Sequence, residues 1–287
     1  MANMRLIRTR IKSVKNTQQI TKAMKMVAAS KLRRTQTAMN SARPFYEKSR
    51  EVLDALLSGG SAADPLTTPR EDVKKVLYVL FVGNRGLCGV YNNAVLHFAR
   101  ELIKNDEREC ELLVCGRWGR DVIMKSGLSV REIMSELSDT PGPDEATALA
   151  EKLRELFLSG EYDEVRLVYQ HYISALRQEP TQLQLLPLVP EKTGDAAPRE
   201  YIFEPDRQSV LGSLLRLCVN STVYSVMLEA RCGEHTARMT AMTAATDSTR
   251  ELIDKLGLSL NRARQAAITT EISEIVGGAS ALRKKKQ

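Results

Sequence analysis

Apolar and small residues at both ends of the chain recur at alternating intervals of three and four. The C-terminal repeat runs through Met239, Met242, Thr246, Thr249, Ile253, Leu256, Leu260, Ala263, Ala267 and Thr270. The N-terminal repeat runs through Met4, Ile7, Ile11, Val14, Gln18, Thr21, Lys25, Ala28 and Leu32. This spacing averages 3.5 residues, which is typical of helices that pair in a coiled coil. The pattern predicts a long helix at each end of the chain, and antiparallel pairing of the two.

The length of these segments favours a coiled coil over the alternative, two amphipathic helices of an ordinary bundle. Residues 1–57 contain a single proline, Pro44, and residues 206–287 contain none. At about 1.5 Å per residue the helices reach roughly 80 Å and 115 Å, whereas a small domain is about 30 Å across. The C-terminal helix is expected to project beyond its partner. Its apolar tip, residues 275–282, then needs an apolar socket in another protein.

The middle of the chain, residues 70–190, alternates between strand-like and helix-like segments. Strands are expected at Lys74–Val82, Glu111–Cys115, Ser129–Ile133, Glu164–His171 and Thr181–Leu188, and helices at Tyr91–Asn105, Gly119–Ser126 and Asp144–Ser159. Such alternation is typical of βαβ units with a mainly parallel sheet. The predicted fold class is therefore α/β, with a Rossmann-like central domain between the helices at 1–57 and 206–287. Breaks rich in glycine or proline, Ser58–Pro69 and Pro187–Pro198, separate the three parts.

Positive charge is concentrated in the first fifty residues. The formal net charge of the whole chain is +7, and residues 1–50 hold thirteen Lys/Arg and one acid, Glu47, so the remainder carries 7 − 12 = −5. A transit peptide has a similar composition, but this segment continues directly into a patterned helix. A helix that binds nucleic acid or a membrane surface, and a solvated helix face, both stay open. The longest apolar run, Val76–Val82, is too short to span a bilayer.

Candidate catalytic chemistry is sparse. The loop Gly83–Gly89 lies where a Rossmann phosphate loop would lie, but its glycines match neither dinucleotide nor P-loop spacing, so a tight turn is favoured over a nucleotide site. Cys88 in this loop has no histidine or carboxylate near it in sequence. Five cysteines form no CxxC pair and three histidines lie far apart, which predicts reduced, idle thiols and no metal site. The acidic segment Asp139–Glu145 reads as a surface loop. We expect no catalytic residue, no cofactor and no metal.

Three segments carry a resemblance to a known family. They are Ile11–Arg34 (IKSVKNTQQITKAMKMVAASKLRR), Arg85–Gly89 (RGLCG), and the C-terminal stretches Ala237–Met242, Ala245–Thr246, Asn261–Thr269, Glu271–Ile272 and Glu274–Ala279. Together they resemble the γ subunits of F-type ATP synthases, in the right order and over the whole length. The chain departs from the family pattern at four places: Gly83-Asn84 stands for Ser-Asp, Val90 for Gly, Leu260 for an aromatic residue, and Asp247-Ser248 for a pair such as Asp-Asn.

The resemblance implies a central rotor shaft with no catalysis of its own. Such a shaft turns inside a ring of three α and three β subunits, binds the ε subunit and rests on the membrane c-ring, so that proton-driven rotation is coupled to ATP synthesis and hydrolysis at the β-subunit sites. Contacts with β are implied for Met24, Arg238, Gln265, Thr269 and Glu271, and a bearing tip for Ile275, Val276, Ala279 and Leu282. The positive charges of Lys22, Lys25 and Lys31 would attract β without specific bonds. From the residues alone, every one of these implied contacts could equally be a solvated or seam position of a coiled coil.

The resemblance also implies a location, while the residues themselves leave two competing functions. The resemblance implies a bacterial protein on the cytoplasmic face of the plasma membrane, peripheral to it, without nucleic-acid binding and without the redox-regulatory cysteines of chloroplast γ subunits. A basic helical nucleic-acid binder is the main competitor, but the first forty residues lack aromatics for base stacking. A nucleotide-using α/β enzyme is the other. Neither competitor explains two heptad helices at opposite ends of the chain.

Overall fold

Two very long helices begin and end the protein in the computed structural model, which describes residues 2–58, 64–135, 137–189, 204 and 206–284. Helix α1 spans Ala2–Ser58 and α5 spans Arg207–Lys284, close to the predicted bounds. Good helix formers dominate both segments. Helix α1 continues through Pro44, whose ring removes one backbone hydrogen bond at an exposed position. Most of the predicted break at 187–198 lies outside the described residues.

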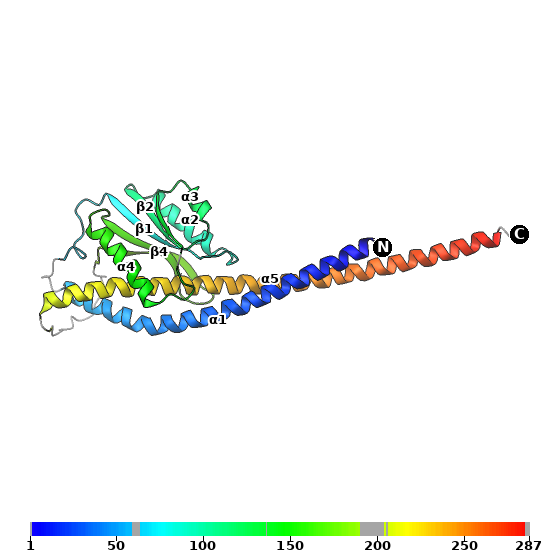
Figure 1. The fold of residues 1–287 in the computed structure, drawn as a ribbon, viewed down its shortest axis with the longest axis horizontal. Helices are drawn as coiled ribbons and strands as arrows, with labels where there is room; N and C mark the ends of the chain where they lie inside the picture. The colour runs from blue at the N-terminus through cyan, green and yellow to red at the C-terminus, as the bar shows by residue number, and fades with distance from the viewer. Residues whose placement is uncertain (1, 59–63, 136, 190–203, 205, 285–287) are drawn as a thin grey trace. The chain divides into compact units, whose positions relative to one another are not determined.

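The chain divides into two compact units that share these two helices. Unit 1 comprises residues 1–27 and 239–287, and unit 2 comprises residues 28–238. In unit 1 the two helices run antiparallel, as Figure 1 shows for the ends of α1 and α5. The predicted division into three domains, residues 1–57, 70–190 and 206–287, stays a prediction.

Unit 2 is built on a five-stranded sheet with the order β3-β2-β1-β4-β5. Strands β1 (Lys75–Phe81), β2 (Glu109–Cys115), β3 (Val130–Met134) and β4 (Glu164–Tyr172) are parallel, and β5 (Gln178–Leu186) pairs antiparallel with β4 at the edge. The central strands read as nearly continuous apolar runs because helices cover both faces. The predicted mainly parallel α/β sheet is confirmed.

Alternate residues of β1 enter two separate cores. Leu77, Val79 and Phe81 face one core, which also takes side chains from α4 (Pro143–Leu158), from the end of α1 and from the first half of α5. Val76, Tyr78 and Leu80 face the other core, under α2 (Tyr91–Lys104) and α3 (Arg120–Met124). This period of two is the ordinary consequence of a pleated strand. The long helix α5 thus begins as a core helix of unit 2 (Figure 1).

Candidate functional site: the paired helices and their junction with the sheet

The heptad seam predicted from the sequence is present in unit 1. Of the residues in the two repeats, those from Met4 to Lys25 on α1 and from Met239 to Ala267 on α5 are all half-buried or buried, while most positions between them are exposed. Thr246 Oγ1 donates a hydrogen bond to Thr21 Oγ1 at 2.9 Å across the seam. The last predicted seam position, Thr270, is exposed, which corrects that part of the prediction. Helix α1 begins at Ala2, so α5 has run past its partner by this point.

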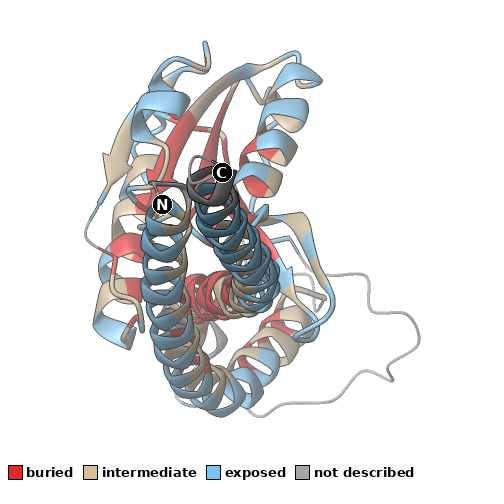
Figure 2. Cartoon of the chain, turned by 90° about the vertical axis from the view of Figure 1, so that its right-hand side faces the viewer, coloured by how far each residue is buried: buried red, intermediate tan, exposed pale blue. Residues whose placement is uncertain are grey.

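The C-terminal end of α5 is a single exposed helix. Every described residue from Arg264 to Ala279 is exposed except Ala267, and Figure 2 shows this end in the colour of exposed residues. Among them are large apolar side chains: Ile275 is 67% exposed and Val276 59% exposed. The Leu282 side chain lies outside the described residues, and Ala279 is exposed. An apolar helix end of this kind is a surface for a partner.

The residues implied as β contacts on this end do not share one face. Gln265 and Thr269 lie one turn apart, and the Thr269 hydroxyl donates to the Gln265 carbonyl at 3.0 Å. At about 100° per residue, Glu271 points roughly 120° away from Gln265. All three are exposed. Such a distribution fits a helix that is surrounded by its partner better than a helix that docks with one side.

The N-terminal half of α1 carries positive charge that the chain does not neutralise. Within the described residues, none of the seven Lys and Arg side chains from Arg5 to Lys25 forms an ion pair, and Lys31, in unit 2, is the first basic residue of α1 that does so, with Asp139. Lys22 is exposed, while Lys25 and Met24 are half-buried at the edge of the seam. Uncompensated like charges on one helix create a field that attracts acidic partners.

Arg238, the last of the five implied contacts to be placed, is engaged inside unit 2. Its Nη2 lies 2.7 Å from Glu234 Oε1 and donates to the carbonyls of Arg85 and Gly86 at 3.2 and 3.3 Å. Its side chain is 12% exposed. The structure therefore places Arg238 at the loop that follows β1, within unit 2, whereas Gln265, Thr269 and Glu271 belong to unit 1.

Glu234 is the buried centre of this junction. It is 1% exposed and lies between Arg238 and Arg231, whose Nη1 is 2.6 Å from Glu234 Oε2. Burial opposes ionisation of this carboxyl, but the two arginines outweigh it and hold the pKa of Glu234 below its ordinary value. The interpretation of the sequence missed Arg231 and Glu234. Glu234 lies three residues after Arg231 and four residues before Arg238, and both are spacings of helical ion pairs. The sequence pattern does not reveal that these pairs are buried.

The Gly83–Gly89 loop packs against α5 instead of forming an open phosphate cradle. A Cβ on Gly83 would lie 2.7 Å from Glu234 Oε1, so the carboxylate fills the space beside the end of β1. The Gly83 amide donates to Asn92 Oδ1 at 2.8 Å, and Leu87 and Gly89 adopt positive φ angles of 61° and 58°. In doubly wound sheets this is the position where ligands bind. Here it is taken by the protein's own side chain, in agreement with the predicted tight turn.

The thiol of Cys88 is not set up as a nucleophile. It is buried, and burial raises the pKa of Cys88 above its ordinary value despite the charge of Arg238. Its sulfur is 3.1 Å from Asn92 Nδ2, and a protonated buried thiol is inert. All five cysteines are free, and four of them are buried. The described residues hold no group of His, Cys, Asp and Glu suited to a metal ion.

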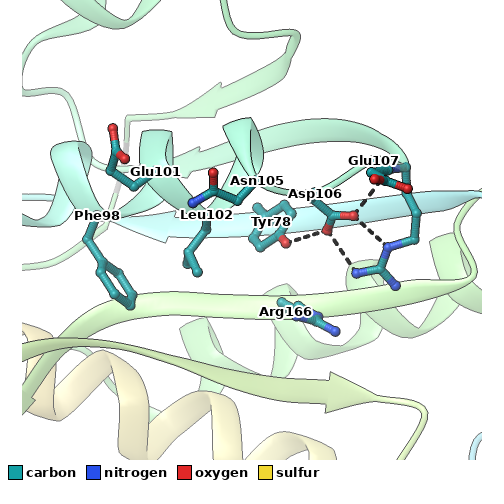
Figure 3. Close-up of a pocket in the computed structure, with 9 residues that line it drawn as sticks. Tyr78, Phe98, Glu101, Leu102, Asn105, Asp106, Glu107 and Arg166 are labelled. Atoms are coloured by element: carbon teal, nitrogen blue, oxygen red, sulfur yellow. Dashed lines mark hydrogen bonds and ion pairs between the residues drawn. The ribbon is translucent and has the colours of Figure 1, made fainter.

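An open pocket of about 680 Å³ lies on the face of the sheet that α2 covers, beside the C-terminal end of α2 (Figure 3). Tyr78 donates from its hydroxyl to Asp106 Oδ2 at 2.8 Å, and Arg108 pairs with Asp106 at 2.7 Å and with Glu164 at 2.9 Å. Arg166 also pairs with Glu164 at 2.9 Å, so the two arginines and two carboxylates neutralise one another. Arg108 holds the pKa of Asp106 well below its usual range. The pocket lies at the amino ends of the strands, opposite the edge where doubly wound sheets bind ligands. We assign no chemistry to it.

One stretch of α5 has the length and composition of a membrane span. It falls within Ser209–Ala279, and 56% of its apolar window is buried inside the protein. This is the expected property of a helix that contributes to a core, as the first half of α5 does.

Comparison with known proteins decides the family. A family profile described as ATP synthase matches residues 3–282. The ATP synthase gamma chain of Desulforamulus reducens is 46% identical over 286 residues, covering 98% of this chain and all of that one, and the gamma chain of Desulfitobacterium hafniense is 45% identical with the same coverage. The chain belongs to the ATP synthase gamma chain family. Gamma chains are the non-catalytic central rotor stalk of a complex that serves ATP synthesis and proton transport, so the predicted shaft without a catalytic site is confirmed.

Solved structures share the gamma-chain fold. A chain of the Euglena gracilis mitochondrial ATP synthase, from an OSCP/F1/c-ring structure, matches with a TM-score of 0.74 at 20% identity, covering all of this chain and 96% of that one. A chain from the central stalk and c-ring of the Tetrahymena thermophila enzyme matches with a TM-score of 0.57 at 24% identity, covering 79% and 99%. At these identities the likeness establishes the fold alone.

Proposed function

We propose that this gamma chain couples rotation of a membrane c-ring to the three β-subunit sites of an α3β3 ring, on the cytoplasmic face of a bacterial plasma membrane. The solved neighbours come from rotor and F1/c-ring complexes, and the relatives named above are bacterial. In this proposal the paired helices contact α and β, while the ε subunit and the c-ring bind elsewhere on the chain. The shaft shifts the conformations of the sites without joining their chemistry.

The observation that carries the proposal is the exposed end of α5. A run of exposed helix with Ile268, Ile272, Ile275 and Val276 on its surface is a solubility liability for an isolated chain. Enclosure by a ring removes that liability, and residues on different faces, such as Gln265 and Glu271, can then meet the ring at the same time. The small residues Gly277, Gly278 and Ala279 suit a helix that must turn within a close-fitting socket.

The uncompensated charge of α1 fits the same proposal. Cations from Arg5 to Lys25 attract acidic segments of β, and Met24 at the edge of the seam then lies at the contact. Gln265, Thr269 and Glu271 remain proposed contacts on α5. Arg238 is a proposed contact with a second role inside unit 2, because its guanidinium already bonds Glu234 and the loop after β1.

A native co-purification tests the partners. The chain is tagged, membranes are extracted gently, and the eluate is analysed for protein, nucleic acid and ATPase activity, before and after nuclease treatment. We expect α, β, ε and c subunits together with ATP hydrolysis that the isolated chain lacks. Recovery of the chain with nucleic acid, lost after nuclease and in high salt, would instead support the basic helix as a nucleic-acid binder.

A further inference from the structure

We infer that Glu234 is a positioning residue that fixes the rotational setting of α5 against the sheet of unit 2, and so is needed for tight coupling between rotation and ATP turnover. The inference rests on the role of the chain as a rotor stalk. It concerns residues 28–238 alone, where α5 leaves the sheet as part of a helix that continues to Lys284.

The first support is that Glu234 organises contacts to the loop after β1. Its carboxylate holds Arg238, whose guanidinium reaches the carbonyls of Arg85 and Gly86. The same carboxylate lies directly beside Gly83, where no side chain has room. Tyr91, at the start of α2, donates from its buried hydroxyl to the Ala230 carbonyl at 2.8 Å. The loop and the helix it introduces are thus bonded to α5 at several points within two turns.

The second support is a matching set of contacts to the connection between β3 and α4. Arg231, the other partner of Glu234, donates to the Leu137 carbonyl at 3.4 Å, and Asn84 Nδ2 donates to the same carbonyl at 2.7 Å. His235 Nε2 bonds the Asp139 carbonyl at 2.9 Å. The segment from Arg231 to Arg238 therefore joins two different loops at the carboxyl edge of the sheet.

The third support is physical. On the N-terminal side of this segment, α5 meets the sheet mostly through aliphatic contacts such as those of Val223, Val226 and Met227, and Glu229 adds a bond to His171 of β4 at 2.6 Å. Apolar contacts resist separation, but they have no preferred direction and oppose sliding or turning of a helix weakly. Charged hydrogen bonds have a fixed geometry. A load that turns the helix about its axis is therefore borne in large part by the polar contacts of residues 229–238, among which Glu234 organises those of Arg231 and Arg238.

The alternative is that Glu234 stabilises the fold and nothing more. The two roles differ in what they do to an assembled enzyme. Loss of folded chain lowers ATP hydrolysis and proton pumping together, because fewer complexes are present. A loosened junction lowers the number of protons pumped for each ATP hydrolysed, and this ratio does not depend on the amount of enzyme.

The test uses the complete ATP synthase in inverted membrane vesicles, with ATP hydrolysis and ATP-driven proton uptake measured on the same sample. Glu234→Gln removes the charge that holds both arginines, and Gly83→Ala displaces the carboxylate while leaving every charge in place. Glu234→Asp keeps the charge on a shorter side chain. Glu155→Gln, at an exposed position on α4, is the matched control.

We expect Glu234→Gln and Gly83→Ala to lower protons pumped per ATP to less than half of the wild-type ratio, Glu234→Asp to give an intermediate ratio, and Glu155→Gln to leave it unchanged. If Glu234→Gln does not assemble, Gly83→Ala and Glu234→Asp decide the question. Wild-type ratios in the assembled variants would overturn the inference. A wild-type chain that supports no coupled pumping would contradict the proposed function instead.

Discussion

Thr246 Oγ1 lies 2.9 Å from Thr21 Oγ1, and this pair forms a polar layer in the seam between α1 and α5. The Thr21 hydroxyl donates its proton to the Gln18 carbonyl at 3.0 Å, so its oxygen acts as the acceptor for Thr246. The layer is buried on the α1 side and half-buried on the α5 side. Polar layers of this kind hold the register of a coiled coil at some expense of stability.

Replacing both members of this layer with valine should raise stability and weaken the register. Removal of one threonine takes away the bond across the seam, although the other hydroxyl keeps its bond to a carbonyl of its own helix, whereas removal of both leaves an apolar layer of similar shape. We expect Thr246→Val alone to cost about 1 kcal/mol of unfolding free energy and the double variant Thr21→Val/Thr246→Val to be neutral or more stable. Denaturant unfolding of the wild type, both single variants and the double variant measures the coupling. Equal losses in the single and double variants would show that the bond has no such role.

Mild acid should destabilise unit 2 through His235. Burial lowers the pKa of His235 below its ordinary value of 6.5, with the Asp139 hydrogen bond working against this shift. The unfolded chain therefore takes up its proton first as the pH falls below about 6.5, and stability drops until the folded imidazole also titrates. One such group changes the unfolding free energy by at most ~1.4 kcal/mol per pH unit.

The pH dependence is measured as unfolding free energy at several values between about pH 7.5 and 5.5. His235→Asn keeps an amide that can donate to the Asp139 carbonyl and removes the titration, so its curve should be flatter than that of the wild type. A variant curve parallel to the wild-type curve would assign the acid sensitivity to other groups.

The sequence was sufficient for the features that depend on periodicity. The 3.5-residue repeats located nearly every seam position, because side-chain burial in paired helices follows that repeat. Strand positions were found because central parallel strands are continuous apolar runs. Thr270 was assigned wrongly because a repeat does not show where the partner helix ends. Arg231 and Glu234 were missed because a charged pair on a helix looks the same whether solvent or a loop covers it.

A bulky side chain near the tip should slow the assembled motor and leave the isolated chain intact. Ala266 is exposed and lies beside the seam residue Ala267. We expect Ala266→Trp to reduce ATP hydrolysis and synthesis by about tenfold, equivalent to about 1.4 kcal/mol in the barrier, with unchanged unfolding of the free chain. Ala267→Trp should instead disturb the seam in the free chain as well. Normal turnover in the Ala266→Trp enzyme would contradict a close-fitting socket.

Charge reversal at Arg238 should weaken the isolated chain as well as the coupled enzyme. Glutamate at this position would face Glu234 and lose the bonds to the loop after β1. Breaking a buried ion pair costs roughly 3–5 kcal/mol, so thermal unfolding should begin at a clearly lower temperature. Reversal at the exposed Arg262 on the same helix is the control. If Arg238→Glu unfolds like the wild type while coupling fails, the arginine acts through β alone.

The most direct test of the rotor account is to watch the chain turn. Leu176, fully exposed in the hairpin between β4 and β5, is replaced by cysteine in a Cys110→Ser background, and a probe is attached there in an immobilised α3β3 complex. The other four cysteines are buried and should not be labelled. The account predicts rotation of the probe in one direction while ATP is hydrolysed. Hydrolysis at the normal rate with a stationary probe would contradict it.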